Sequence, residues 1–502
     1  MCFALLGTSM NLLAQKMPSV EIKAQDVFNK TIMQSELGQY MTPKQIAVFM
    51  ASLFDNSASE EIRLLDAGAG SGSLTLAFLE HFLKANILNV FDVHAWEIDP
   101  LMVDQLTIKL INYKDSVKKE EKNNLFINIH LSDFINDSVS ILKLSDHKKF
   151  THAILNPPYK KIKNDSKHKL LLHQVGIETV NYYSAFLALS IKLMEDKGQI
   201  VAIIPRSFCN GPYYKSFRKL ILNSCAIKQI HLFESRKNLF KGDNVLQENV
   251  IIYLEKNGIQ GSVQVSKSFD ANFDDYECET YSFNSIIKEE NSEFFIHIPI
   301  KSVVSLLLPM YSLAKLNIQL STGKVVDFRV KEFWSQSYDK DLVPLIYPHH
   351  FTNGIFEYPK VHKKPNALIL NDVIKKMVMP SGYYVLVKRL SSKEERRRVV
   401  AYVFNPTLLN ASYFAFENHW NVFHVNNQGL EKYVAYGLAS FLNSTFFEDC
   451  FRGFSGLTQV NATDLRMMKY PSIAKLSELG KKTYNKRLSQ VEIDEYVQSI
   501  NH

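Results

Sequence analysis

Between residues 62 and 255, short apolar runs alternate with amphipathic stretches, and this alternation constrains the fold more than any other feature of the sequence. The runs with the length of β-strands lie at residues 62–65, 93–96, 125–129, 151–155, 199–204, 226–233 and 249–254. Strands that alternate with helical patterns predict an α/β fold with a doubly wound, mostly parallel, seven-stranded sheet. The last two runs have no helical pattern between them, so we expect one of these strands to run antiparallel.

A glycine-rich turn follows the first apolar run, with the sequence D-A-G-A-G-S-G at residues 66–72. Glycine lets a backbone pass close to a ligand, and the helix expected next offers free N–H groups, so such turns bind nucleotides at the carboxyl edge of a parallel sheet. The spacing differs from the dinucleotide pattern G-x-G-x-x-G, and the lysine of an ATP-binding loop is absent. A purely structural tight turn is the alternative interpretation.

Two acidic residues follow the next two strands. Glu97 ends the second apolar run, where a carboxylate can accept hydrogen bonds from both ribose hydroxyls of a nucleoside. Asp133 follows the third run, where it can accept from an adenine amino group, with Phe134 beside it for ring contact. The alternatives are a surface acid for Glu97 and a helix cap for Asp133.

The sequence N-P-P-Y at residues 156–159 directly follows the fourth run and is the most specific motif in the chain. Two prolines fix the backbone and remove two N–H donors. The groups that then face outward are the Asn156 amide oxygen, the Pro157 carbonyl and the Tyr159 ring. Two acceptors beside an aromatic face suit a planar group that carries an exocyclic NH₂.

Together these motifs resemble those of gamma-class N6-adenine DNA methyltransferases, which belong to type II restriction–modification systems. The resemblance covers residues 38–255 well, includes a further cofactor motif at residues 38–43, and implies a Rossmann-like methyltransferase fold. It implies S-adenosyl-L-methionine as the cofactor. The implied cofactor-binding residues are Tyr40, Thr42, Asp66, Ala67, Gly68, Gly70, Glu97, Ile98, Asp133, Phe134 and Asn156.

The resemblance also implies that Asn156, Pro157 and Tyr159 are catalytic. The enzyme would flip an adenine out of the duplex and transfer a methyl group to its N6 atom by direct displacement, without a metal ion. Tyr159 would stack on the flipped base. Phe240 resembles the family's second stacking aromatic residue, with Phe233 as the alternative.

The net charge of +7 is unevenly distributed along the chain. Residues 301–502 contain 26 Lys and Arg against 17 Asp and Glu, so the basic surplus lies in this region. A polyanion such as double-stranded DNA is the expected partner of such a region, although an ordinary basic surface is the alternative. The expected DNA-binding residues are Lys388, Arg389, Arg396, Arg397 and Arg398 around a hairpin, with Gln459 and Asn461 as base-reading candidates.

These patterns divide the chain into four parts. We expect an N-terminal extension at 1–37, a catalytic domain at 38–260, a polar and acidic linker at 261–300, and a target-recognition domain at 301–502. The last is expected to be mixed α+β, with strands at 383–388 and 399–404.

No apolar stretch reaches the length of a transmembrane helix, so we expect no membrane span. The five cysteines are scattered, which favours a reducing cytoplasm over a structural zinc site. With the resemblance to restriction–modification enzymes, the expected location is the bacterial cytoplasm. We expect a monomer that works alongside a separate restriction endonuclease. The alternatives that use the same N-P-P-Y corner are a protein N5-glutamine methyltransferase and an RNA N6-adenine methyltransferase. The basic region after the sheet disfavours both.

Overall fold

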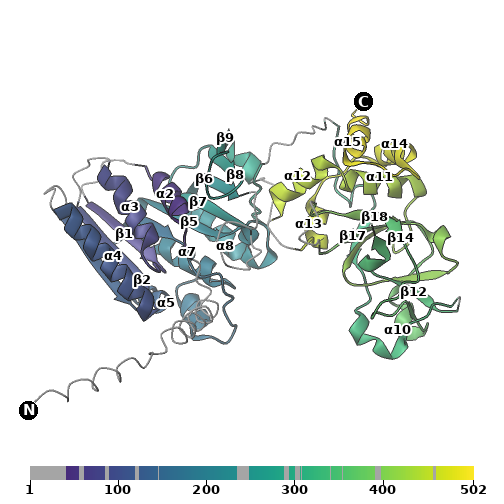
Figure 1. The fold of residues 1–502 in the computed structure, drawn as a ribbon, viewed down its shortest axis with the longest axis horizontal. Helices are drawn as coiled ribbons and strands as arrows, with labels where there is room; N and C mark the ends of the chain where they lie inside the picture. Colours follow the sequence, from purple (N-terminus) through teal and green to yellow (C-terminus); the bar gives the residue numbers. More distant parts are fainter. Residues whose placement is uncertain are drawn as a thin grey trace, which may run out of the picture.

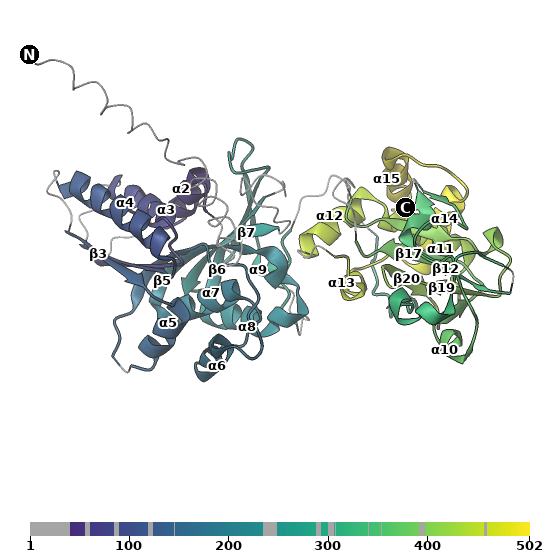
Figure 2. The same cartoon turned by 60° about the horizontal axis from the view of Figure 1, so that its bottom comes forward.

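The computed structural model describes residues 41–501, except for 56–60, 85–89, 119–123, 145, 234–247, 288–292, 300–305, 307, 340, 353, 391–396 and 456–458. Figures 1 and 2 show two lobes side by side, one built on the first sheet of the chain and the other on the sheets and helices that follow residue 300. We call them the catalytic lobe and the C-terminal lobe. Within the described residues, no helix is long and apolar enough to cross a membrane.

The catalytic lobe contains the expected strands in the order β3-β2-β1-β4-β5-β7-β6. Their bounds are β1 Glu61–Ala67, β2 Val90–Glu97, β3 Asn124–Leu131, β4 Phe150–Leu155, β5 Met194–Pro205, β6 Cys225–Phe233 and β7 Asn249–Lys256. Strands β1 to β5 pair in parallel, whereas β7 lies between β5 and β6 and runs antiparallel to both. The doubly wound, mostly parallel arrangement of these seven strands, with one of the last two antiparallel, is thereby confirmed.

Helices cover both faces of this sheet, as Figure 2 shows. Consecutive side chains of a strand point to opposite faces, so Leu64 packs in one apolar cluster and Leu65 in another. The helices on the Leu64 face are α2 Lys44–Ser52, α3 Ser73–Lys84 and α4 Pro100–Lys118. The helices that contribute to the cluster of Leu65 are α5 Phe134–Leu142, α6 Lys167–Gln174, α7 Tyr182–Leu193 and α8 Lys215–Ser224.

Within the expected linker at 261–300, the described residues 261–287 extend the sheet instead. Strand β8 (Val263–Ser268) pairs in parallel with β6, and β9 (Glu277–Tyr281) pairs antiparallel with β8, which gives nine strands. The acidic stretch that suggested a linker forms the turn between them. Both carboxylate oxygens of Asp275 accept from the Phe269 amide, at 2.9 and 3.0 Å.

The C-terminal lobe combines small sheets with a group of helices, in agreement with the expected α+β character. One sheet has the order β10-β20-β17-β18 and another β11-β15-β12-β19-β16. The expected hairpin is present as β17 (Tyr384–Lys388) and β18 (Ala401–Phe404). The bounds of the other strands are β10 Gln319–Thr322, β11 Trp334–Ser335, β12 Val343–Ile346, β13 Phe351–Thr352, β14 Ile355–Phe356, β15 Ala367–Leu368, β16 Val378–Pro380, β19 Tyr413–Phe416 and β20 Trp420–His424.

The helices of the C-terminal lobe are α10 Asp372–Lys375, α11 Lys432–Leu442, α12 Thr445–Phe454, α13 Ala462–Met467, α14 Ile473–Thr483 and α15 Gln490–Gln498. Two of them, α11 and α14, cross with their backbones in contact. A Cβ atom added to Gly437 of α11 would lie 1.8 Å from the Leu476 carbonyl oxygen, and one added to Gly480 of α14 would lie 1.8 Å from that of Tyr433. Only glycine fits at either crossing position.

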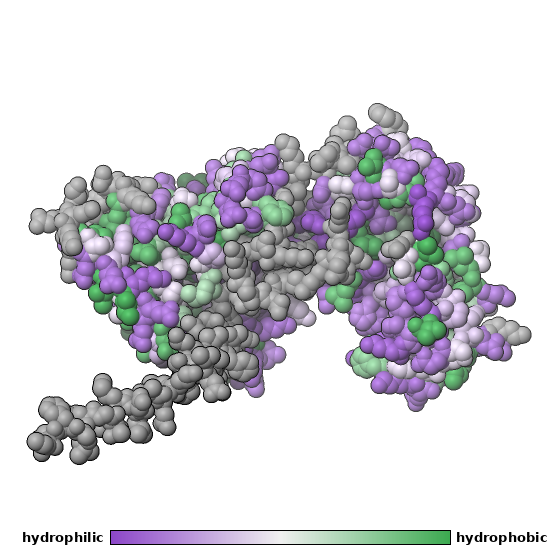
Figure 3. Space-filling view, in the orientation of Figure 1, coloured by the Kyte–Doolittle hydropathy of each residue, from purple (hydrophilic) through white to green (hydrophobic). Residues whose placement is uncertain are grey.

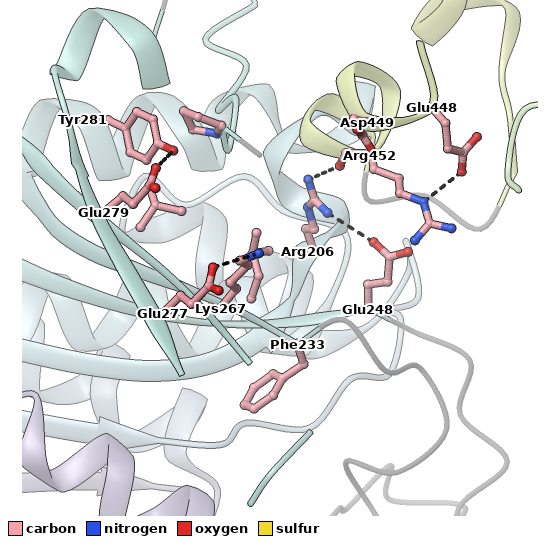
Figure 4. A pocket seen from close by; sticks show the side chains of 13 residues that line it. Arg206, Phe233, Glu248, Lys267, Glu277, Glu279, Tyr281, Glu448, Asp449 and Arg452 are labelled. Atoms are coloured by element: carbon pink, nitrogen blue, oxygen red, sulfur yellow. Dashed lines mark hydrogen bonds and ion pairs between the residues drawn. The ribbon is translucent and has the colours of Figure 1, made fainter. Parts of the chain in front are cut away.

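The two lobes meet at a network of charged residues beside a cavity of about 300 Å³ (Figure 4). Glu248 pairs with Arg206, which directly follows β5, and with Arg398, which precedes β18; both distances are 3.4 Å. Arg206 also donates to the Arg452 carbonyl of α12. Glu448 of α12 accepts from the Arg398 amide at 2.8 Å. This network joins the end of β5 to the C-terminal lobe.

Candidate active site

The carboxyl ends of β1, β2, β3 and β4 surround a cavity of about 210 Å³. Each of the four motifs singled out in the sequence contributes to its wall. The lining residues are Met41, Gly68, Gly70, Trp96, Glu97, Ile98, Met102, Ser132, Asp133, Phe134, Ile135, Asn156, Pro158, Lys160, His168, Tyr182 and Phe186. The fold therefore brings together residues that lie more than 100 positions apart.

The glycine turn forms one side of this cavity. Gly68, Gly70 and Gly72 have φ values of 78°, 55° and 78°, a region that disfavours residues with a side chain. The Gly68 amide donates to the Trp96 carbonyl at 2.9 Å, and the Gly70 amide donates to Glu97 Oε2 at 2.8 Å. The turn is thus fixed against the end of β2.

Asp66 lies behind the turn and not in the cavity wall, which differs from its expected place among the cofactor contacts. Asp66 is the penultimate residue of β1, its side chain is fully buried, and its Oδ2 atom accepts from the Thr75 hydroxyl at 2.6 Å. Its Oδ1 atom has no hydrogen-bond partner among the described residues. Burial raises the pKa of Asp66 to about 7. Ala67 is buried as well, so both residues support the turn from behind.

Glu97, the last residue of β2, is held beside the glycine turn by backbone amides. Its Oε1 atom accepts from the amides of Ile98 and Asp99, at 2.8 and 2.9 Å, while Oε2 accepts from Gly70. Burial raises the pKa of Glu97 above its ordinary value, although these backbone donors act in the opposite direction. Ile98 remains half exposed and lines the cavity next to it.

Asp133 serves as a helix cap and also lines the cavity. Its Oδ1 atom accepts from the Asn136 amide at the start of α5, at 3.0 Å, and Oδ2 lies 2.7 Å from His168 Nε2. The Nδ1 atom of His168 lies 2.9 Å from the Tyr182 hydroxyl. Burial alone would raise the pKa of Asp133, but the hydrogen bonds from His168 and Asn136 outweigh it and lower the pKa. Phe134 follows as an apolar wall.

His168 and Tyr182 are site residues that the sequence analysis missed. His168 lies in α6 and Tyr182 is the first residue of α7, and the sequence shows no motif at either position. The contact between His168 and Asp133 joins positions 35 residues apart, and no local pattern signals it.

The Asn-Pro-Pro-Tyr corner lies at the end of β4. This strand flanks β1 on the side away from β2, so the glycine turn lies between the corner and Glu97. Asn156 donates from Nδ2 to the Thr42 hydroxyl at 2.9 Å, and its Oδ1 atom accepts from the Tyr159 hydroxyl at 3.1 Å. The Tyr159 ring is buried and packs edge-on against Tyr183. Pro157 is buried, whereas Pro158 lines the cavity. The motif before the glycine turn therefore meets the corner through Thr42.

Arg397 and Arg398, two of the expected DNA contacts, have structural partners instead. Arg398 is buried and donates to the Ser455 carbonyl at 2.7 Å, besides its pair with Glu248. Arg397 is partly buried and donates to Gln490 Oε1 at 2.6 Å and to the Ser444 carbonyl at 3.0 Å. Their guanidinium groups satisfy acceptors at the ends of neighbouring helices, so Arg398 in particular is not placed to reach a phosphate.

The remaining expected DNA contacts are more accessible. Lys388 is partly exposed, with Nζ 5.4 Å from the Tyr402 ring centroid, and Arg389 donates to the Asn418 carbonyl at 3.0 Å. Gln459 is exposed and Asn461 is half-buried at the start of α13. Tyr40, Phe240 and Arg396 lie outside the described residues. Within the described residues, no group of three or more His, Cys, Asp or Glu could hold a metal ion.

Comparison with known proteins identifies the family. Residues 37–240 match the Eco57I restriction-modification methylase family model. The type II methyltransferase M.BsuBI of Bacillus subtilis is 49% identical over 480 residues, which cover 93% of this chain and 94% of the relative. The chain belongs to the type II methyltransferase family. The type II methyltransferase M.PstI of Providencia stuartii is 41% identical over 501 residues, which cover 98% of this chain and 97% of the relative.

A solved structure described as a DrdV–DNA complex is similar in fold to this type II methyltransferase. Its TM-score is 0.50 with 12% identity, and the match covers 92% of this chain and 58% of that chain. As a type II methyltransferase, the protein is an enzyme of a restriction–modification system and acts on DNA.

The cofactor of this type II methyltransferase is S-adenosyl-L-methionine. The residues of the cavity fit an adenosine group, whose ribose hydroxyls and amino group are hydrogen-bond donors. Glu97 and Asp133 supply carboxylate acceptors at two places in the wall, and Trp96, Phe134 and Phe186 supply an apolar lining.

Proposed function

We propose that this methyltransferase transfers a methyl group to the N6 atom of an adenine in a specific double-stranded DNA sequence, as a gamma-class enzyme. The transfer protects the host DNA from a separate restriction endonuclease, and the enzyme works as a monomer. The observation that carries this proposal is the position of Asn156, which lines the same cavity as the glycine turn, Glu97 and Asp133.

In this proposal different cavity residues bind different groups of the cofactor. Glu97 accepts from the ribose hydroxyls, and Asp133 accepts from the adenine amino group with Phe134 against the ring. Gly68, Gly70 and Ile98 line the path between these groups, and Tyr40 and Thr42 close over the methionine end. Asp66 and Ala67 act indirectly, by supporting the turn.

The chemistry at the corner follows from its acceptors. The bound cofactor supplies an electrophilic methyl group. Asn156 Oδ1 and the Pro157 carbonyl accept from the two N6–H groups of the adenine and hold the amino group in line with that methyl. These hydrogen bonds strengthen as positive charge develops on N6, so they stabilise the transition state more than the bound substrate.

Base flipping needs stacking partners, because removing a base from the duplex costs a few kcal/mol. We propose that the Tyr159 hydroxyl gives up its bond to Asn156 Oδ1 when the adenine enters, and that the ring then stacks on the base. Phe240 is the proposed second stacking residue. One base–aromatic contact is worth roughly 1–3 kcal/mol, which offsets the cost of flipping.

For DNA contact we retain Lys388, Arg389 and Arg396 as phosphate-binding residues, with Gln459 and Asn461 as base-reading residues. Arg398 is not among them, because it is buried and its guanidinium pairs with Glu248 and donates to the Ser455 carbonyl. Arg397 is not among them, because its guanidinium donates to both Gln490 and the Ser444 carbonyl.

The test is to express the chain in a bacterial host that lacks DNA methylation and to sequence the genome by a method that detects modified bases. We expect N6-methyladenine at one recurring sequence. The variant Asn156→Ala should leave no modification, and Asn272→Ala, a change at an exposed turn residue, should leave it intact. Label from the methyl donor found on RNA or on a protein amide, with none on DNA adenine, would refute the proposal.

A further inference from the structure

The loop between β14 and β15, residues 357–366, presents an apolar side chain to solvent among basic residues. Val361 is fully exposed, at 104% of its reference area, and follows Lys360. His362, Lys363 and Lys364 come directly after it. Figure 3 shows that the region of the C-terminal lobe near α10 and β12 is largely hydrophilic, with isolated apolar spots. A single exposed valine is ordinary, so its surroundings decide its meaning.

The loop is held in one conformation by Asn366, which is buried. Its Oδ1 atom accepts from the Lys360 amide at 3.0 Å, and its Nδ2 atom donates to the Lys360 carbonyl at 3.0 Å and to the Gln336 carbonyl at 2.9 Å. The Tyr358 hydroxyl donates to the Asn366 carbonyl. Because these bonds hold the base of the loop, binding a ligand there costs less conformational entropy than it would in an unattached loop.

A surface groove of about 600 Å³ lies beside this loop. It is lined by Pro348, His349, Phe351, Thr352, Lys360, Val361, His362, Lys388, Leu390 and Tyr402, a set without carboxylates. The rings of His349 and His362 are stacked, with centroids 4.1 Å apart. The groove therefore combines basic groups with ring faces, which suits a polyanion that also offers planar bases.

The basic groups differ in how firmly they are engaged. Lys360 pairs with Glu357 at 2.7 Å, and Lys364 pairs with Asp327, so both help to hold the loop. Lys363 is exposed at the tip. A phosphate contact is therefore best assigned to Lys363, two residues after Val361.

We propose that this loop and groove contact the target DNA duplex, with Val361 against a base edge and Lys363 and Lys388 on phosphates. The inference rests on the proposed function and adds a recognition element that the sequence motifs did not indicate. An apolar side chain recognises the methyl group of thymine, and the positive charge of the region attracts the backbone. The region after residue 300 carries the whole basic surplus of the chain, which favours DNA over a neutral or basic partner.

The experiment measures binding of the full chain to a duplex with the methylated sequence found above and to a scrambled duplex, at several salt concentrations. Lys363→Ala should weaken binding to both duplexes and reduce the slope of log affinity against log salt by about 1. Val361→Ala should weaken binding to the specific duplex by about tenfold, with little change for the scrambled one. Thermal unfolding of both variants should match the wild type, because both side chains are exposed.

Matched controls come from other exposed positions. Ile259→Ala replaces an apolar residue that is 83% exposed between β7 and β8, and Lys481→Ala replaces an exposed lysine of α14; neither should change binding. If Lys363→Ala and Val361→Ala behave like these controls while the wild type still methylates adenine, the inference is overturned and the proposed function stands. A wild type that neither binds nor methylates duplex DNA would overturn both.

Discussion

The Nε2 atom of His168 lies 2.7 Å from Oδ2 of Asp133, so a residue of α6 holds the carboxylate that begins α5. The Tyr182 hydroxyl holds the other nitrogen of the same ring. This chain of contacts fixes the direction of an acceptor in the cofactor cavity. It also keeps that carboxyl group ionised, because a hydrogen-bond donor favours the charged form.

The first prediction concerns His168. Its replacement by alanine should weaken binding of S-adenosylhomocysteine by about tenfold, since a hydrogen bond to a charged group contributes about 1.5–3 kcal/mol and part of this is lost. His168→Gln, which retains a donor, should recover part of the affinity. Isothermal titration calorimetry measures the change, and His173→Ala, at an exposed position of the same helix, serves as the control. Equal affinities for His168→Ala and the control would exclude this role.

The same pair predicts a pH dependence. The pKa of Asp133 is lowered from its ordinary value of 3.8. In the wild type this carboxylate is therefore ionised, and remains a hydrogen-bond acceptor, at both pH values compared below. Without His168, burial is less opposed and the pKa rises. The affinity of His168→Ala for the cofactor product should therefore fall at a higher pH than that of the wild type, which calorimetry at pH 5 and 7.5 can compare.

A second pH effect is expected at Asp66, whose folded pKa of about 7 lies above the ordinary value of 3.8. Its contribution to stability is present in full below the unfolded pKa and is lost as the pH rises from about 4 to about 7. Asp66→Asn removes the ionisation and keeps an acceptor for Thr75. The melting temperature of this variant should fall less than that of the wild type between pH 5 and pH 8, and identical pH profiles would contradict the assignment.

Arg398 should matter for stability and not for phosphate binding. Removing a buried charge that pairs with Glu248 and holds a carbonyl should destabilise the chain by about 3 kcal/mol in Arg398→Ala. Denaturant unfolding measures this loss, with Arg487→Ala at an exposed position as the control. Under conditions where both variants are folded, the salt dependence of DNA binding should equal that of the wild type. A slope reduced by about 1 would instead make Arg398 a phosphate contact.

The helix crossing in the C-terminal lobe gives a further prediction. A methyl group on Gly437 would overlap the Leu476 carbonyl, so α11 and α14 would have to separate. Gly437→Ala should cost at least about 3 kcal/mol, the upper end for overpacking, because the obstacle is backbone. Gly261→Ala meets open space and should be neutral. Chemical denaturation of both variants provides the comparison.

The strands and the site motifs could be predicted from the sequence because both are local patterns. Apolar runs mark buried parallel strands, and the end of each strand is where the ligand-binding residues lie, so Glu97, Asp133 and Asn156 are found by position alone. His168 could not be found this way, because its importance comes from a contact across the fold. The same holds for Arg398, since a cluster of arginines looks alike whether it faces solvent or neighbouring carbonyls.

The extent of the catalytic lobe was also misjudged for a physical reason. The acidic stretch at 270–275 has the composition of a linker, but its aspartates cap the turn between two strands. The available signal in the sequence was the alternation of Val263 and Val265 with polar residues, and this pattern is short. Both valine side chains are buried in the structure.

Strands β8 and β9 determine where this chain could be recombined with a relative to change its DNA specificity. A junction at residue 260 would strip the outer strands from the sheet and leave the backbone of β6 open to pairing with another molecule. Ile296 and Ile298 still pack in the core of the catalytic lobe, so its fragment has to extend to residue 299. Chimeras joined after that position should stay folded, whereas those joined at 260 should aggregate.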